Sequence, residues 1–220
     1  MQKLFTEGIE HTQFKETKIG RIPEEWEVTR IGGVTDIHGG STPLTTEENY
    51  WDDGDILWAT PTDITSLSSK YISNTSRKIT QKAVDETSLR LCEPGTILMT
   101  SRATIGYPAI TEKPITTNQG FINIHCKKVI ETLFLYYWII QNRRILERFA
   151  QGSTFVELSK KDFRRLFIAL PPLTEQHKIT EILSEVDAKI ETEQAFKEEL
   201  EKLKKGLMQV LLTGEVRVKV

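Results

Sequence analysis

The sequence contains few cysteines and no long apolar run, and both absences narrow the class of protein. Its 220 residues include two cysteines, Cys92 and Cys126, which lie outside any CxxC or Cys/His cluster. This usage predicts a reduced, cytoplasmic protein without structural zinc. Because no run of about 18 apolar residues occurs, we expect no transmembrane helix and no membrane partner. Residues 1–10 lack the apolar stretch and small-residue cleavage site of a secretory signal.

The motifs of common catalytic centres are also missing. Neither GxxxxGK[ST] nor GxGxxG occurs, so no phosphate-binding loop for nucleotide hydrolysis is predicted. The Pro171-Pro172 pair follows a leucine, whereas methyltransferases that act on base amino groups place Asn or Asp there. Glu16-Thr17-Lys18 has an E-x-K spacing, but no Asp precedes it to complete a nuclease metal site. We therefore predict a chain with no catalytic residue, no metal ligand and no bound cofactor.

Charge is unevenly distributed along the chain, although the formal net charge is only −2. Residues 1–55 contain 5 Lys or Arg against 12 Asp or Glu, whereas residues 56–170 contain 16 against 9. A basic central section in an acidic chain is typical of a surface that faces phosphates. The alternative is that these are ordinary solvated side chains.

The pattern of apolar residues predicts an α+β fold. Short apolar segments separated by Gly, Pro, Asn and Asp predict strands near residues 27–31, 55–60, 96–100, 120–124 and 167–170. Helical spacing predicts helices within residues 78–90 and 130–149. A further short helix over 160–166 should begin at a capping box formed by Ser159 and Asp162. The fold class is thus a globular mixed α/β domain followed by a long coiled-coil helix.

The long helix is predicted from the sequence after the Pro171-Pro172 pair. Thr174 is the expected N-cap, with Glu175 in the first turn. Eight of the ten heptad a and d positions are apolar, the polar ones being Lys189 and Glu193. The helix would be about 58 Å long at about 1.5 Å per residue. Such a helix needs a partner for its apolar stripe, for which we predict Ile179, Ile182, Val186, Phe196, Leu200, Leu203, Leu207 and Val210 as the dimer interface.

These segments predict a lead-in over residues 1–19, a globular domain over 20–172, a coiled-coil helix over 173–214 and a tail over 215–220. The first six residues, Met1-Gln-Lys-Leu-Phe-Thr6, share Met, Gln, Leu and Thr with Met208-Gln-Val-Leu-Leu-Thr213. The first residues of the chain therefore repeat part of the sequence near its end. A unit that is followed by another unit like it would show this pattern.

Several motifs resemble those of a known family. Leu170-Pro-Pro-Leu-Thr-Glu-Gln-His-Lys-Ile179, the heptad helix and Leu203-Lys-Lys-Gly-Leu-Met-Gln-Val-Leu-Leu-Thr-Gly214 resemble the conserved helical region of the specificity subunit of Type I restriction–modification systems. Segments of the globular part resemble pieces of that family's target recognition domains: Gly20-Arg-Ile-Pro-Glu-Glu-Trp26, Gly54-Asp-Ile-Leu-Trp58, Thr100-Ser-Arg-Ala-Thr-Ile-Gly106 and Asn118-Gln-Gly120. The resemblance covers nearly the whole chain.

The resemblance implies a non-catalytic subunit that recognises double-stranded DNA while partner subunits act on it. Modification subunits would methylate adenine and a restriction subunit would translocate and cut, so S-adenosylmethionine, ATP and magnesium are implied for the partners only. Family members usually carry two target recognition domains and two helical regions, whereas this chain has one of each. It is then either a half-length subunit that forms a homodimer or one half of a longer protein. An orphan DNA-binding module and a coiled-coil adaptor without restriction partners are the alternatives.

Candidate DNA-contacting residues fall into two groups. Basic side chains of the central section are expected to contact phosphates: Arg77, Lys78, Lys82, Lys113, Lys127 and Lys128. Polar side chains near turns between strands are expected to contact base edges, with Arg102 suited to guanine and Asn118 or Gln119 to adenine. The full set of base-contact candidates is Thr60, Ser101, Arg102, Thr104, Asn118 and Gln119. For Asn118 and Gln119 a hydrogen bond that braces the loop is the alternative.

Overall fold

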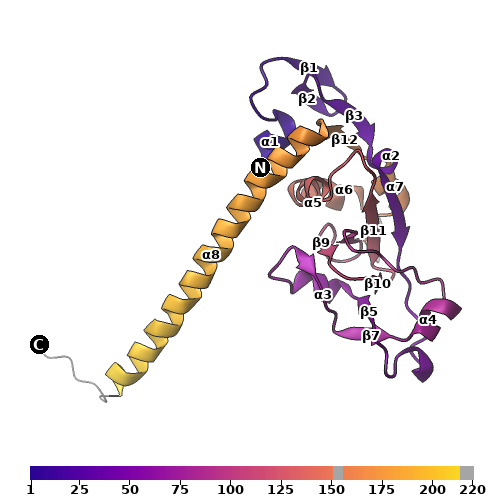
Figure 1. Cartoon of the computed structure of the whole chain (residues 1–220), viewed down its shortest axis with the longest axis vertical. Coiled ribbons are helices and arrows are strands. Elements are labelled where there is room, and N and C mark those ends of the chain that lie inside the picture. Colours follow the sequence, from indigo (N-terminus) through magenta and orange to yellow (C-terminus); the bar gives the residue numbers. More distant parts are fainter. Residues whose placement is uncertain (151–155, 214–220) are drawn as a thin grey trace, which may run out of the picture. The chain divides into compact units, whose positions relative to one another are not determined.

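The computed structural model describes residues 1–150 and 156–213, which divide into two compact units. We call Met1–Ile179 the globular unit and Thr180–Val220 the helical unit. The predicted tail over 215–220 lies outside the described residues. Among the described residues, no helix combines the length and apolar character needed to cross a membrane. The α+β prediction is confirmed, with strands and short helices in the globular unit and a long helix at the end of the described chain (Figure 1).

The first thirty residues form part of the globular unit. α1 (Gln2–Thr6) buries Phe5, whose ring lies 5.2 Å from that of Phe134. β1 (Phe14–Thr17) and β2 (Gly20–Pro23) form an antiparallel hairpin across the predicted boundary at residue 20. β3 (Glu27–Arg30) then pairs with β12 (Phe167–Leu170), so both strands predicted at these positions are present.

Two sheets form the centre of the globular unit. The larger has the order β4-β11-β8-β9-β6, with β4 (Thr35–Gly39), β11 (Phe121–Cys126), β8 (Ile97–Thr100), β9 (Pro108–Thr111) and β6 (Tyr71–Ile72). The smaller has β5 (Ile56–Ala59) between β10 (Ile115–Thr117) and β7 (Arg77–Ile79). Leu57, Leu98 and Phe121 belong to one buried cluster that takes residues from both sheets. Burial of this apolar surface favours the folded state.

Short helices connect and flank the strands. They are α2 (Ile31–Val34), the 3₁₀ turn η1 (Glu48–Tyr50), α3 (Pro61–Thr65), α4 (Gln81–Glu86), α5 (Thr132–Gln141), α6 (Arg143–Phe149) and α7 (Lys160–Arg165). The helix predicted over 130–149 is two helices, because Asn142 leaves the helical conformation and its side-chain amide donates to the Trp138 carbonyl. The cap predicted at Ser159 is confirmed, since its hydroxyl accepts from the Asp162 amide at 3.0 Å.

The long helix is α8 (Leu173–Leu212), and the N-cap predicted for it is wrong. Thr174 is inside the helix and is not its cap, because the pair Pro171-Pro172 ends the preceding strand and the helix begins directly after it. The side chain of Gln176 accepts from the Glu131 amide and donates to the carbonyls of Pro171 and Val129. These bonds fix the first turn of α8 to the rest of the globular unit.

Most of the predicted interface residues on α8 are accessible. Ile182, Val186, Phe196, Leu200, Leu203 and Leu207 are 40–59 % exposed and Val210 is half-buried. Ile179 differs, because its side chain is completely buried within the chain. It has no surface to offer a second helix, and we therefore remove it from the predicted dimer interface.

Candidate nucleic-acid interface

The C-terminal ends of several strands lie together on one side of the globular unit. β5 and β10 run in parallel and pair at their last residues, so the segments after Ala59 and Thr117 start side by side. The Asn118 amide donates to the Ala59 carbonyl at 3.0 Å. The parallel pairing and this hydrogen bond together hold the starts of the two segments side by side.

A third segment, Gly40–Pro43, lies on the same side. The Ser41 amide donates to the Thr117 carbonyl at 2.9 Å, and the indole of Trp58 donates to the Ser41 carbonyl at 3.1 Å. The approach is so close that a Cβ on Gly40 would lie 2.1 Å from the Thr117 carbonyl oxygen. Only glycine fits this position without displacing the backbone.

The segment after β8 completes the group. The Ser101 amide donates to the Gly120 carbonyl at 2.8 Å, and Arg102 forms a β-bridge and a 3.0 Å ion pair with Glu157. Ala103 has a positive φ of 56°, which is unusual outside glycine and marks a tight turn. We call the four segments Gly40–Pro43, Thr60–Pro61, Ser101–Gly106 and Thr117–Gly120 the loop cluster.

The loop cluster contains all six base-contact candidates, and two of them, Thr60 and Asn118, form hydrogen bonds within the chain. Thr60 caps α3, with its hydroxyl donating to Asp63 at 2.6 Å. Burial alone would raise the pKa of Asp63, but hydrogen bonds from Thr60 and Ser76 outweigh it and lower that pKa. Asn118 accepts from the Gly120 amide at 2.8 Å, which is the bracing role considered as its alternative.

The remaining candidates separate into buried and exposed side chains. Ser101 is 1 % exposed and lies inside the loop cluster. Arg102 is half-buried, while Thr104 and Gln119 are exposed, and Gln119 accepts a hydrogen bond from Thr42. Arg102, Thr104 and Gln119 are therefore the candidates that present polar atoms outward, and their contact with bases stays a prediction.

The phosphate candidates lie in three places. Lys78 and Lys113 line one groove of about 690 Å³, and Lys82 is exposed on the adjacent α4. The guanidinium of Arg77 stacks on Trp51, 3.7 Å from the ring centre. Lys127 and Lys128 follow the far end of β11, where Lys127 lies 3.6 Å from Asp36. β11 runs from Phe121 to Cys126, so these two lysines and the loop cluster lie at opposite ends of that strand.

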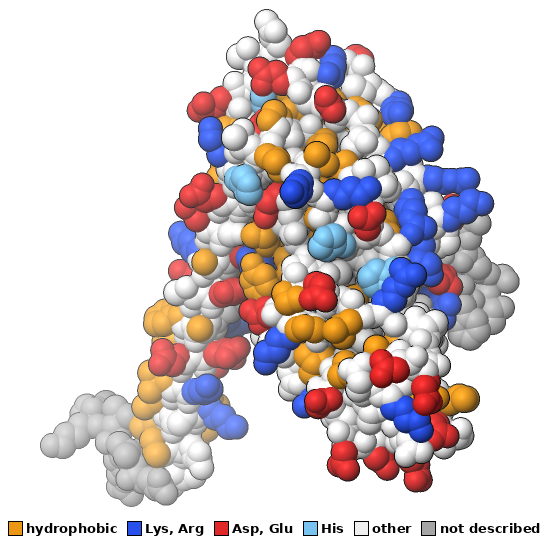
Figure 2. Space-filling model, turned by 45° about the vertical axis from the view of Figure 1, so that its right-hand side comes forward, with side chains coloured by type: hydrophobic (Ala, Val, Ile, Leu, Met, Phe, Trp, Pro, Cys, Tyr) orange, Lys and Arg blue, Asp and Glu red, His pale blue; other side chains and the backbone are white. Residues whose placement is uncertain are grey.

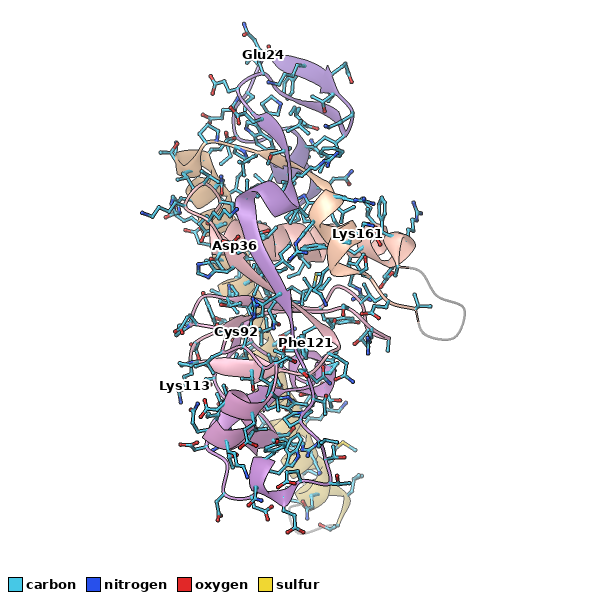
Figure 3. The ribbon with its side chains drawn as sticks, turned by 90° about the vertical axis from the view of Figure 1, so that its right-hand side faces the viewer. Glu24, Asp36, Cys92, Lys113, Phe121 and Lys161 are labelled. Atoms are coloured by element: carbon cyan, nitrogen blue, oxygen red, sulfur yellow. The ribbon has the colours of Figure 1, made fainter. Side chains whose placement is uncertain are left out.

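The structure also brings together basic residues that were not predicted. α7 has four cations in six residues, Lys160-Lys161-Asp162-Phe163-Arg164-Arg165, and it packs beside β4 (Figure 3, Lys161). Lys160 lies against Gly39, and Arg164 donates to the Ile37 carbonyl. The density of positive charge in this segment was visible in the sequence, although its position beside β4 was not.

The cysteines have no visible chemical role. Burial raises the pKa of the Cys92 thiol to about 12 and is also the main cause of the same value for Cys126. Both thiols are free. Among residues 1–150 and 156–213, no group of three or more His, Cys, Asp or Glu side chains is arranged to hold a metal ion.

Known proteins that are similar to this chain include specificity subunits of Type I restriction enzymes. The model of the Type I restriction modification DNA specificity domain matches residues 23–202. The specificity subunit of the Type I restriction enzyme MjaIX of Methanocaldococcus jannaschii is 45 % identical over 87 % of this chain and 45 % of its own length. The putative MjaX specificity subunit of the same organism is 32 % identical over the whole chain and 50 % of its own length.

Solved structures agree on the fold. The HsdS subunit from Thermoanaerobacter tengcongensis matches 90 % of this chain and 47 % of its own chain, with a TM-score of 0.65 and 21 % identity. This chain spans about half the length of the curated relatives that it matches. The predicted family is confirmed: the chain belongs to the family of Type I restriction modification DNA specificity domains.

Proposed function

We propose that this chain recognises one half of a bipartite DNA target and pairs through α8 with a second copy of itself. The loop cluster is the observation that carries the proposal. Two of its four segments, which follow strands of different sheets, carry Arg102, Thr104 and Gln119. Side chains of these types can distinguish base pairs through the major groove.

The exposed stripe on α8 supports the pairing. Phe196, Leu200 and Leu203 are 56 %, 49 % and 59 % exposed. A helix that leaves a regular apolar stripe in water is destabilised unless another helix covers it. Symmetric pairing of two copies would make the two half-targets identical and inverted. The 40 residues of α8 span about 60 Å at about 1.5 Å each, which corresponds to roughly 18 base pairs at about 3.4 Å each.

The chemistry is then supplied by other subunits. The chain would bring a modification subunit to its target adenine and a restriction subunit to the same DNA, and it would itself bind no cofactor. The MjaIX and MjaX relatives are named as specificity subunits of Type I restriction enzymes, which supports this division of roles.

Co-expression with the modification subunit of its own system tests the proposal. Methylated adenines should appear in one sequence context when both proteins are present, and in none when this chain is omitted. Methylation without a sequence preference, or methylation that does not need this chain, would contradict the proposal.

A further inference from the structure

The outer face of β4 and β11 carries polar side chains. Register pairs place Asp36 opposite His125 and His38 opposite Asn123, and paired residues in a sheet point to the same side. Ile37 and Ile124 point to the opposite side and are buried. Asp36 and His125 are exposed, His38 is half-buried and Asn123 is completely buried, so this outer face is open to solvent at Asp36 and His125 and closed at Asn123.

Two cationic side chains from other segments act on His38. Lys160 comes from α7, and a Cβ built on Gly39 would lie 2.8 Å from its Nζ, so the amine rests on the backbone next to His38. Arg90 precedes Cys92, whose Sγ is 3.4 Å from Nε2 of His38. Burial, and then the charges of Arg90, His125 and Lys160, lower the pKa of His38 below its usual 6.5.

The acidic residue of β4, Asp36, already forms an ion pair. Asp36 shares the outer face but lies 3.6 Å from Nζ of Lys127. Besides burial, the cations Arg90 and Lys160 act on His38. Like charges held close together oppose folding, and Arg90 and Lys160 are exposed and bury little apolar surface in return. Figure 2 shows histidine side chains beside a band of lysines and arginines on the face in view.

We propose that Arg90, His38, His125 and Lys160 form a binding site for a phosphate of the DNA backbone. An anion held between these side chains would remove their mutual repulsion, and arginine and lysine are the usual donors to phosphate oxygens. This inference rests on the proposed function and adds a positioning contact to it, outside the loop cluster.

The position of the site fits that role. β4 runs from Thr35 toward Gly39, and the next residue, Gly40, already belongs to the loop cluster. From His38 to Thr42 the chain advances four residues, at most about 13 Å at about 3.3 Å per residue. That distance corresponds to about four nucleotides along one strand at about 3.4 Å each. A phosphate held at His38 would therefore fix the register of the bases at the loop cluster.

The test compares two double variants of the chain in complex with its modification subunit. Arg90→Gln/Lys160→Gln removes two exposed cations of the site, and Lys3→Gln/Lys178→Gln removes two exposed cations elsewhere in the globular unit. Affinity for the target duplex and for an unrelated duplex is measured over a range of salt concentrations. Circular dichroism checks that each variant is folded.

The proposed phosphate site predicts a loss of DNA affinity that does not depend on the sequence of the duplex. Arg90→Gln/Lys160→Gln should weaken binding to both duplexes by a similar factor, about tenfold or more, and reduce the slope of log K against log salt by about 1 to 2. Lys3→Gln/Lys178→Gln should leave the slope unchanged. Equal slopes for wild type and Arg90→Gln/Lys160→Gln would overturn the phosphate site alone. A wild-type complex that prefers no DNA sequence would overturn the proposed function, and the site with it.

Discussion

The indole Nε1 of Trp26 donates a 2.9 Å hydrogen bond to Oε2 of Glu175, joining residues that are 149 positions apart. The other carboxylate oxygen of Glu175 accepts from the Ile9 amide at 3.0 Å and lies 2.8 Å from Nε2 of His11. Trp26 is completely buried and Glu175 is 8 % exposed. One carboxylate therefore ties the first turn of α8 to the start of the chain.

Replacing Glu175 with Ala should destabilise the globular unit. The indole and the Ile9 amide would lose their acceptor in a largely dry environment, and each unsatisfied donor costs about 1–3 kcal/mol. We expect urea unfolding followed by tryptophan fluorescence to show a loss of about 2–4 kcal/mol. Glu181→Ala, at an exposed position further along α8, is the matched control and should change stability by less than about 0.5 kcal/mol. Equal stabilities for the two variants would show that the Glu175 contacts contribute little.

This junction illustrates what the sequence could and could not predict. The strands at 27–31, 96–100 and 167–170 were predictable because apolar side chains and turn residues encode them locally. The hydrogen bonds from Gln176 to Glu131 and Val129, which hold the first turn of α8, join residues that are 45 and 47 positions apart, so no local pattern predicts them. Periodicity assigned Ile179 to an interface because it shares the spacing of Ile182, and only the packed structure separates the two.

The candidate site shows the same limit. The six base-contact candidates were chosen because they lie near turns between predicted strands, and residues such as Gly, Asn and Ser mark turns by their local chemistry. The exposure of each side chain was not predictable, so Ser101 and Gln119 received the same role although one is buried and the other exposed. The side chains around His38 come from positions 90, 125 and 160, and sequence spacing does not reveal that these positions meet.

Two glycine substitutions should have opposite effects on stability. Gly40→Ala places a Cβ 2.1 Å from the Thr117 carbonyl oxygen, so the backbone must move, at a cost of about 1–3 kcal/mol. Gly206→Ala meets nothing within 4 Å and replaces glycine inside a helix, which should stabilise α8 by up to about 1 kcal/mol. Thermal unfolding should therefore show a lower melting temperature for Gly40→Ala and a higher one for Gly206→Ala. A neutral Gly40→Ala would mean that the loop cluster is loosely packed.

Asn118 and Gln119 should separate into a structural and a recognition residue. Asn118→Ala removes the acceptor of the Gly120 amide and should cost about 1 kcal/mol of stability. Gln119→Ala should leave stability within about 0.5 kcal/mol. It should also relax the preference at one base pair by about 1–3 kcal/mol. Unfolding curves and competition with singly substituted duplexes measure the two effects. The assignment fails if Gln119→Ala keeps the full base preference.

His38 should make stability depend on pH. Its pKa is lowered in the folded chain, mainly by burial, so the unfolded chain binds the proton more readily. The free energy of unfolding should therefore fall as the pH drops below the unfolded value of 6.5. His38→Gln removes this contribution, and its stability should decline less than that of the wild type between about pH 7.5 and about pH 5. Parallel pH curves for the two proteins would contradict the assignment.

The stripe on α8 should control self-association. Leu200→Ala/Leu203→Ala removes two exposed apolar side chains and should shift a dimer toward monomer, while the spectrum of the globular unit stays unchanged. Glu198→Ala/Glu199→Ala changes neighbouring exposed residues outside the predicted a and d positions and serves as the control. Sedimentation velocity over a range of concentrations compares them. A Leu200→Ala/Leu203→Ala variant that sediments like the wild type would place the contact elsewhere.

Selection of bound sequences from a random duplex library, with the chain in complex with its modification subunit, tests the central claim most directly. Two copies joined through α8 should recover two identical, inverted half-sites separated by a gap of fixed length in which no base is preferred. A continuous target, or two unlike half-sites, would contradict the pairing of two copies on one duplex.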